Sequence, residues 1–187
     1  MRLLILLVAL FGFASPAAAD APSHLKSLEQ QLRFLEAANP GNVGIAALDL
    51  TSGEMVSVQG DEPFPMASTV KVAIAAQYLA QVEHGRRSLD QQIGGRPARR
   101  HLEAMIIKSD NQSTDVILRD LGGPTKVQLW LAQNQVSGVR VDRSIARLLS
   151  DRRDLRDRRD SATPKAMVSL LQRIDSGKLL KPSSRSY

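Results

Sequence analysis

The stretch that organises the chain covers residues 64–82, and from residue 70 onward its apolar side chains occupy every side of a helical wheel. Helices with this pattern lie inside a domain, whereas a surface helix keeps a polar face. Pro65 disfavours helix just before the stretch, and Ser68 and Thr69 belong to the residue types that begin helices. The pattern therefore predicts a buried central helix that begins close to Ser68.

Apolar residues recur at helical spacing in other parts of the chain as well. Residues 25–38 predict an amphipathic helix that packs against the core. Further helices are expected at about residues 102–108, after residue 109, from Pro124 and from Pro164, with one more beginning near residue 179. Residues 142–162 show little regular pattern and predict a long loop. Connections of that length without structure are uncommon and are usually functional or disordered.

Strand patterns are confined to the N-terminal third of the chain. Residues 43–50 and 54–59 are strand-like, and the turn residues between them predict a β-hairpin. Two strands alone are marginally stable in water. Nothing after Gln59 predicts a third strand that would cover their edges, so the sheet is expected to be incomplete.

The N-terminus resembles a secretory leader. Arg2 is followed by an apolar run over residues 3–13 and by three alanines at residues 17–19, just before Asp20. The run is too short to span a bilayer comfortably. We therefore expect an exported protein, periplasmic or secreted, with one domain over residues 20–187 and no stable membrane anchor. The chain has no cysteine, which excludes disulfides and thiolate metal sites.

The net charge of +6 is weak evidence for a nucleic-acid partner. The arginines of residues 151–160 alternate with aspartates, which suits a solvated loop with internal ion pairs. Aromatic residues, on which bases stack, make up only 4% of the chain. We therefore expect no nucleic-acid binding.

Ser68 and Lys71 are the polar exceptions in the first turn of the predicted central helix. Residues at this spacing share one face of a helix and lie within hydrogen-bonding reach. Desolvation lowers the pKa of a lysine amine, and the positive end of the helix favours an anion at the serine. The pair therefore fits a nucleophile and its base. Taken alone, it also fits an ordinary helix cap and a surface lysine.

Further segments decide between these interpretations because they occur in a fixed order. After the predicted hairpin come Met66-Ala67-Ser68-Thr69-Val70-Lys71, Ser109-Asp110-Asn111-Gln112-Ser113-Thr114-Asp115, Leu121-Gly122-Gly123-Pro124 and Ala162-Thr163-Pro164-Lys165-Ala166-Met167. As an ordered set they resemble the class A serine β-lactamases and the related penicillin-binding proteins. The resemblance implies an α+β fold, with an all-helical part beside an antiparallel sheet of which only the first hairpin is present.

The resemblance also implies a role for each site residue. Ser68 would be the acylated nucleophile, and Lys71 would help to remove its proton. Ser109 would relay a proton to the leaving nitrogen, and Asn111 would bind the substrate amide and help to hold Lys71. Asp110 would be structural. Ser109-Asp110-Asn111 would otherwise be a simple helix cap, which these residue types also favour.

The chain departs from the family pattern in three ways. It contains no Lys-Thr-Gly, which together with the incomplete sheet suggests that its C-terminal part is missing. Ser144, Ile145 and Ala146 stand where the deacylating glutamate of the lactamases belongs, so turnover of an acyl-enzyme is expected to be slow. The interval between Lys71 and Ser109 is also short for the family, and residues 94–97 are a candidate deletion point.

One family feature outside the motifs is retained. Arg143 and Asp160 match an ion pair that fixes the two ends of the long loop; otherwise they are two exposed charges of little energetic weight.

The expected partner is a small molecule, either a β-lactam or a cell-wall peptide, and the protein is expected to be a monomer without a metal or organic cofactor. Three other functions stay open: a D-alanyl-peptide peptidase or transpeptidase, an esterase, and an inactive fragment that at most binds cell-wall peptide. His24, His84 and His101 lack ligand spacing and are expected at the surface, and Trp130 is expected to be a packing residue.

Overall fold

The structure is a computed structural model that describes residues 24–187 except residues 40, 153, 155 and 156. The predicted leader at residues 1–19 lies outside the described residues. Within the described part of the chain, no helix is long and apolar enough to cross a membrane.

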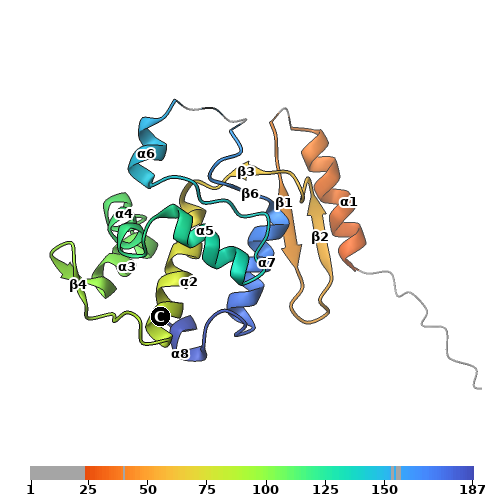
Figure 1. The fold of residues 1–187 in the computed structure, drawn as a ribbon. Helices are drawn as coiled ribbons and strands as arrows, with labels where there is room; N and C mark the ends of the chain where they lie inside the picture. The colour runs from red at the N-terminus through yellow and green to blue at the C-terminus, as the bar shows by residue number, and fades with distance from the viewer. Residues whose placement is uncertain (1–23, 40, 153, 155–156) are drawn as a thin grey trace, which may run out of the picture.

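Helices dominate the fold, and most strands are short (Figure 1). The longer helices are α1 (His24–Ala37), α2 (Val70–Glu83), α3 (Ala98–Ile107), α4 (Asn111–Asp120), α5 (Pro124–Gln133) and α7 (Pro164–Asp175). The short ones are η1 (Ala67–Thr69), α6 (Ile145–Ser150) and α8 (Pro182–Arg185). The strands are β1 (Ile45–Leu48), β2 (Met55–Val58), β3 (Phe64–Pro65), β4 (Gln92–Ile93), β5 (Arg96–Pro97) and β6 (Ser161–Ala162).

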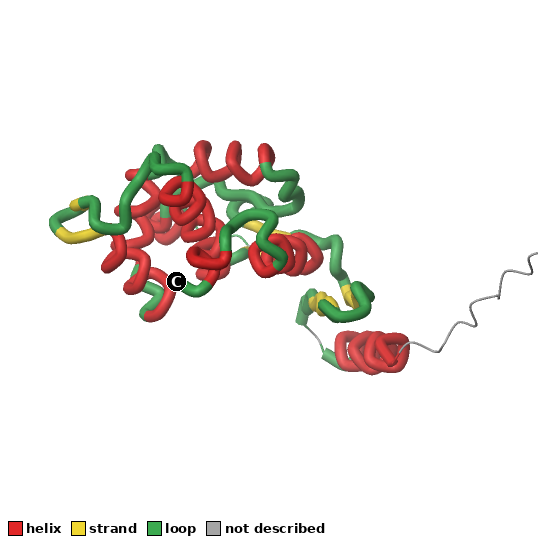
Figure 2. The backbone as a smooth tube through the Cα atoms, turned by 90° about the horizontal axis from the view of Figure 1, so that it is seen from below, coloured by secondary structure: helices red, strands yellow, loops and turns green. Residues whose placement is uncertain are grey.

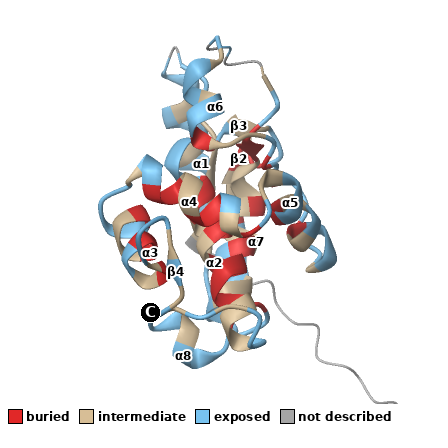
Figure 3. Ribbon diagram, turned by 60° about the vertical axis from the view of Figure 1, so that its left-hand side comes forward, coloured by how far each residue is buried: buried red, intermediate tan, exposed pale blue. Residues whose placement is uncertain are grey.

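The centre of the domain is α2, as the apolar pattern predicts. It contacts α3, α4, α5 and α8, and Figure 3 shows buried residues along its length. Ile74 and Tyr78 are fully covered, and even Lys71 and Gln77 are buried. Because it is packed on all sides, the helix holds its first turn in a fixed position relative to α3 and α4.

The predicted hairpin is formed by β1 and β2, in antiparallel register with Ile45 opposite Val58 and Leu48 opposite Met55. It lies between α1, which packs on β2, and α7, which packs on β1 (Figures 1 and 2). Among the described residues no third strand pairs with it. The expectation that α1 packs into the core is wrong, since Phe34 and Leu35 are exposed and no α1 residue belongs to the main core cluster.

Four strands after Gln59 were not predicted because each is only 2 residues long. β4 and β5 form a tight hairpin whose turn residues, Gly94 and Gly95, have φ values of 54° and 84°. Such turns require positive φ at both central positions, which glycine adopts without steric cost. β3 pairs with β6, and this pairing joins the approach to α2 with the end of the long loop.

The long loop contains the unpredicted helix α6. Ser144 caps it, because the Ser144 Oγ accepts from the Arg147 N–H at 3.2 Å. The sequence signal was a serine followed by Ile145 and Leu148, which is too short a pattern to be distinguished from chance.

The prediction that all three histidines lie at the surface is wrong for His101, which is only 3% exposed. Its Nδ1 accepts from Arg96 Nε at 3.3 Å, so its Nε2–H donates to the Ile93 carbonyl at 2.9 Å. His101 therefore stabilises the β4–β5 hairpin against α3. His84 is exposed as expected, and the side chain of His24 lies outside the described residues.

Replacing Ile74, which is 0% exposed, by alanine should lower the free energy of unfolding by about 2–5 kcal/mol, because it leaves a cavity at the centre of the core. The matched change Ile107→Ala, at a side chain that is 78% exposed, should cost less than about 0.5 kcal/mol. Urea denaturation measures both. Equal losses for the two variants would contradict the central position of α2.

Candidate active site

Ser68 lies at the start of α2, in the short helix η1, and its side chain is exposed. The preceding residue, Ala67, has a φ of 45°, a left-handed conformation that is costly for a residue with a Cβ. The turn is held by buried Met66, whose carbonyl accepts from Thr69 Oγ1 at 2.7 Å. This geometry presents the Ser68 hydroxyl at the N-terminal end of a buried helix, where a developing negative charge is favoured.

Lys71 is only 3% exposed, and its ammonium lies between Ser68 and the loop that joins α3 to α4. Lys71 Nζ is 3.2 Å from Ser68 Oγ and 2.8 Å from Ser109 Oγ. It is also 2.6 Å from the Ser109 carbonyl oxygen and 2.9 Å from Asn111 Oδ1. One buried amine thus contacts all the polar groups that the sequence singled out as reactive or substrate-binding.

The second hydroxyl group belongs to Ser109, whose Oγ is 2.8 Å from Ser68 Oγ. Ser109 has a φ of 53°, which turns the chain sharply between α3 and α4. Asp110 then caps α4 by accepting from the Ser113 N–H at 2.7 Å. Hydrogen bonding from the Ser113 side chain, and after it from the Ser113 backbone N–H, lowers the pKa of the Asp110 carboxyl. The structure thus brings Ser68, Lys71, Ser109 and Asn111 together, with Asp110 at the helix cap behind them.

Burial lowers the pKa of Lys71 from its usual value of 10.5, and the charge of Asp110 opposes this effect only in part. The Ser109 carbonyl and Asn111 Oδ1 can only accept, so they take two N–H groups of the amine. A neutral amine would then direct its lone pair toward the two hydroxyls. The arrangement can therefore accept a proton from Ser68 and return one through Ser109.

The two ends of the long loop are joined by a buried ion pair. Arg143 Nε is 2.5 Å from Asp160 Oδ2, and the two side chains are 9% and 6% exposed. Asp160 Oδ1 also accepts from the Arg143 N–H at 3.0 Å. The Asp160 carbonyl accepts from the Met66 N–H at 3.0 Å. The ion pair is therefore connected directly to the turn that carries Ser68.

Asp115 was given no role from the sequence, yet it fixes the position of α6. Its two carboxylate oxygens accept from the Ile145 N–H at 2.7 Å and from the Ala146 N–H at 2.8 Å. A carboxylate at a helix N-terminus is favoured by the orphan N–H groups there. The only sequence signal was its place at the end of the 109–115 segment.

Carboxylates are sparse next to the nucleophile. Lys71 forms no ion pair within the described ranges, and the long loop begins α6 at Ile145 with Ser144 as its cap. Nor does the described part of the chain contain a group of three histidine, cysteine, aspartate or glutamate residues that could hold a metal ion. The side chains at hand supply acid–base chemistry through the lysine and the two serines.

Two cavities flank the turn that carries Ser68. One, of about 340 Å³, is lined by Ala67 and by residues of the long loop, and the other, of about 370 Å³, is lined by Thr69 together with β1, β3 and α7. Ser68 itself lines neither cavity, and it is exposed to solvent.

Comparisons with known proteins agree over most of the chain. A sequence model of the beta-lactamase enzyme family matches residues 27–187. The chain is 33% identical to Beta-lactamase L2 of Stenotrophomonas maltophilia, over 92% of this chain and 63% of that protein. It is 28% identical to Beta-lactamase Toho-1 of Escherichia coli, over 91% of this chain and 64% of that protein. The chain thus spans less than two thirds of the length of these curated relatives.

Solved structures show the same relationship. The reconstructed class A β-lactamase of the last common ancestor of Gram-negative bacteria has a TM-score of 0.79 and 33% identity, covering 86% of this chain and 68% of that one. A β-lactamase from Xanthomonas campestris has a TM-score of 0.78 and 27% identity, covering 86% and 66%. This likeness confirms the predicted α+β fold.

Replacing Arg143 by aspartate should loosen the long loop, because it leaves the buried Asp160 carboxylate beside a like charge. Thermolysin cleavage next to Leu148 and Leu149 should then become about tenfold faster or more, since it follows the population of open loop. Arg140→Asp changes the same charge at an exposed neighbour, half of whose side chain is accessible, and should leave the cleavage rate nearly unchanged. Equal rates in both variants would remove the proposed role of the ion pair.

Proposed function

The chain belongs to the class A serine β-lactamase family, and from this membership we propose that Ser68 attacks the amide carbonyl of a β-lactam and forms an acyl-enzyme. The observation that carries the proposal is the contact of Lys71 Nζ with both Ser68 Oγ and Ser109 Oγ, at 3.2 and 2.8 Å. A nucleophile and a base within hydrogen-bonding reach are what acyl transfer through serine requires.

In the proposed acylation, neutral Lys71 accepts the hydroxyl proton as Ser68 Oγ bonds to the carbonyl carbon. The resulting oxyanion is stabilised by the Ser68 backbone N–H; losing such a donor elsewhere costs about 3–4 kcal/mol of barrier. When the carbon–nitrogen bond breaks, the ring nitrogen takes the Ser109 hydroxyl proton. The Lys71 ammonium then returns a proton to Ser109 Oγ across 2.8 Å. Asn111 binds the substrate amide and holds Lys71.

Hydrolysis of the acyl-enzyme is proposed to be slow. Family lactamases use a glutamate to activate the deacylating water, and Ser144, Ile145 and Ala146 stand at that place in this sequence. The hydrogen-bond partners of Lys71 among the described residues are serines and an asparagine, none of which is a general base of comparable strength. The proposed product is therefore a persistent covalent adduct.

The contact of Lys71 Nζ with Ser68 Oγ and Ser109 Oγ also favours a second candidate, a D-alanyl-peptide peptidase or transpeptidase. Such an enzyme uses the same acylation half, with a cell-wall peptide as donor and another acceptor for the acyl group. Asp110, Arg143 and Asp160 would be structural in either case. We also propose export through the leader at residues 1–19 and a monomer that needs no metal or organic cofactor.

Intact-mass measurement after incubation with benzylpenicillin tests the acylation step. The protein should gain the mass of one penicillin, and the adduct should persist. Ser68→Ala should reduce the rate of adduct formation about 10³-fold or more, while Ser137→Ala, at an exposed loop serine, should not change it. The measurement is made on this chain.

Two results would contradict this account. Absence of an adduct would remove Ser68 as the nucleophile. Rapid nitrocefin turnover would overturn slow deacylation while leaving the nucleophile intact.

The rate of acylation should rise with pH, with a midpoint below 10.5, because only the neutral Lys71 amine accepts a proton and burial lowers its pKa. In Lys71→Ala the rate should fall and this rising limb should disappear. Lys108→Ala, at an exposed lysine beside Ser109, is the matched control and should keep the limb. Stopped-flow acylation by nitrocefin at several pH values gives the profile. A limb retained in Lys71→Ala would assign the base elsewhere.

A further inference from the structure

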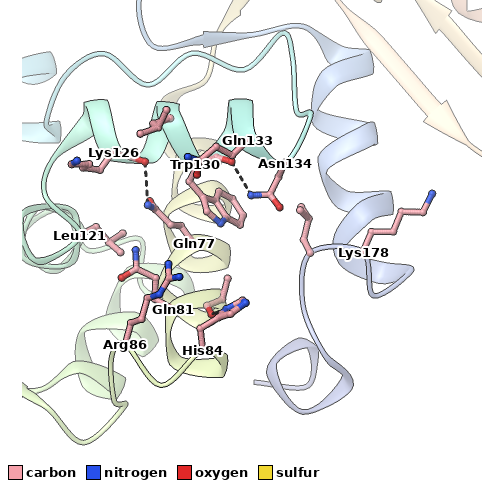
Figure 4. A pocket seen from close by; sticks show the side chains of 13 residues that line it. Gln77, Gln81, His84, Arg86, Leu121, Lys126, Trp130, Gln133, Asn134 and Lys178 are labelled. Carbon is pink, nitrogen blue, oxygen red and sulfur yellow. Dashed lines mark hydrogen bonds between the residues drawn. The ribbon is translucent and has the colours of Figure 1, made fainter.

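Another cavity, of about 480 Å³, lies between α2, α5 and the segment before α8 (Figure 4). Its volume is in the range of small-molecule binding sites. The α2 residues that line it, from Gln77 to Gln81, belong to the C-terminal half of the helix, and His84 follows the helix end. Ser68 and Lys71 lie at the other end. The cavity is therefore separate from the candidate active site.

Gln77 is the buried polar residue of this cavity. It is only 2% exposed, and its Nε2 donates to the Lys126 carbonyl at 3.1 Å. A carbonyl can only accept, so the amide nitrogen must face it and the amide orientation is fixed. Gln77 Oε1 is then buried with no hydrogen-bond partner among the described residues. A buried acceptor without a partner destabilises the folded state by about 1–3 kcal/mol, and a hydrogen-bond donor would remove this penalty.

Trp130 is the aromatic wall of the cavity, and Figure 4 shows its indole beside Gln77. Leu121, Leu129 and Leu179 add apolar surface. Gln77, which carries the unpaired Oε1, and Trp130 line the same cavity. The ring-sized apolar surface and the orphaned acceptor thus lie next to each other.

The charged residues around the cavity are all of one sign. Arg86, Lys126 and Lys178 line it, and no aspartate or glutamate does. None of the three forms an ion pair in the part of the chain that the structure describes. Figure 4 shows Lys126 and Lys178 at opposite sides, extending away from Trp130, with Arg86 across from α5. The lining therefore favours an anion.

We propose that this cavity binds a small organic anion with a planar, ring-sized body and one hydrogen-bond donor. The ring packs against Trp130 and the leucines, the donor reaches Gln77 Oε1, and the anionic group pairs with Arg86, assisted by the flexible lysines. The site works independently of acylation at Ser68.

The chain has a single tryptophan, so its fluorescence reports directly on this cavity. The probe is 4-amino-3-nitrobenzoate, a quencher that carries a ring, an amine donor and a carboxylate. It should quench Trp130 saturably, and the quenching should weaken with added salt because screening reduces the charge attraction. The neutral 4-amino-3-nitrobenzamide is the matched ligand and should bind at least about tenfold more weakly.

Charge-reversal variants of the full chain locate the anion. Arg86→Glu should raise the dissociation constant about tenfold or more, since repulsion replaces a charge-assisted contact. Lys178→Glu should also raise the dissociation constant. Lys26→Glu makes the same charge change on exposed α1 and should leave it unchanged. Circular dichroism verifies that each variant is folded.

Non-saturable quenching, equal quenching by the acid and the amide, or an unchanged dissociation constant in both Arg86→Glu and Lys178→Glu would each overturn the proposal. Because Ser68→Ala should bind the probe as the unaltered chain does, failure of this site and failure of the acylation proposal are distinguishable.

Discussion

The site depends on the burial of one amine. Lys71 is 3% exposed, and a charged or polar group in that position is tolerated only when its hydrogen bonds are satisfied. Its partners come from a distant part of the chain, the Ser109 carbonyl and Asn111 Oδ1, at 2.6 and 2.9 Å. These hydrogen bonds of the Lys71 amine therefore hold the α3–α4 loop against α2. The same docking brings the hydroxyls of Ser68 and Ser109 to 2.8 Å from each other.

A second set of contacts fixes the approach to α2. The β3–β6 pairing and the Asp160 carbonyl hold the segment before Ser68, and Arg143 holds Asp160. The left-handed Ala67 is strained, and such strain persists only where the surroundings over-determine it. Buried Met66 and the ends of the long loop are these surroundings. The serine is thus positioned from both sides, by a packed helix after it and a pinned loop before it.

The sequence was informative where a pattern is long or a motif has a fixed order. The all-apolar wheel of residues 70–82 predicted the central helix, and the spacing of Ser68 and Lys71 predicted their contact. Strands 2 residues long carry too little periodicity to be recognised. The burial of His101 and the capping of α6 by Asp115 depend on contacts between distant segments, which local pattern does not encode. The cavity beside Trp130 was missed because helical spacing alone suggests packing.

The central claim is that Lys71 is held as an amine that gives up its proton unusually easily. Nuclear magnetic resonance of protein labelled with ¹³C at the lysine Cε positions follows each lysine through a pH titration, and the Lys71→Ala spectrum assigns the signal. The account predicts that the Lys71 signal titrates below the usual lysine pKa of 10.5. A Lys71 signal that titrates at or above 10.5 would contradict it.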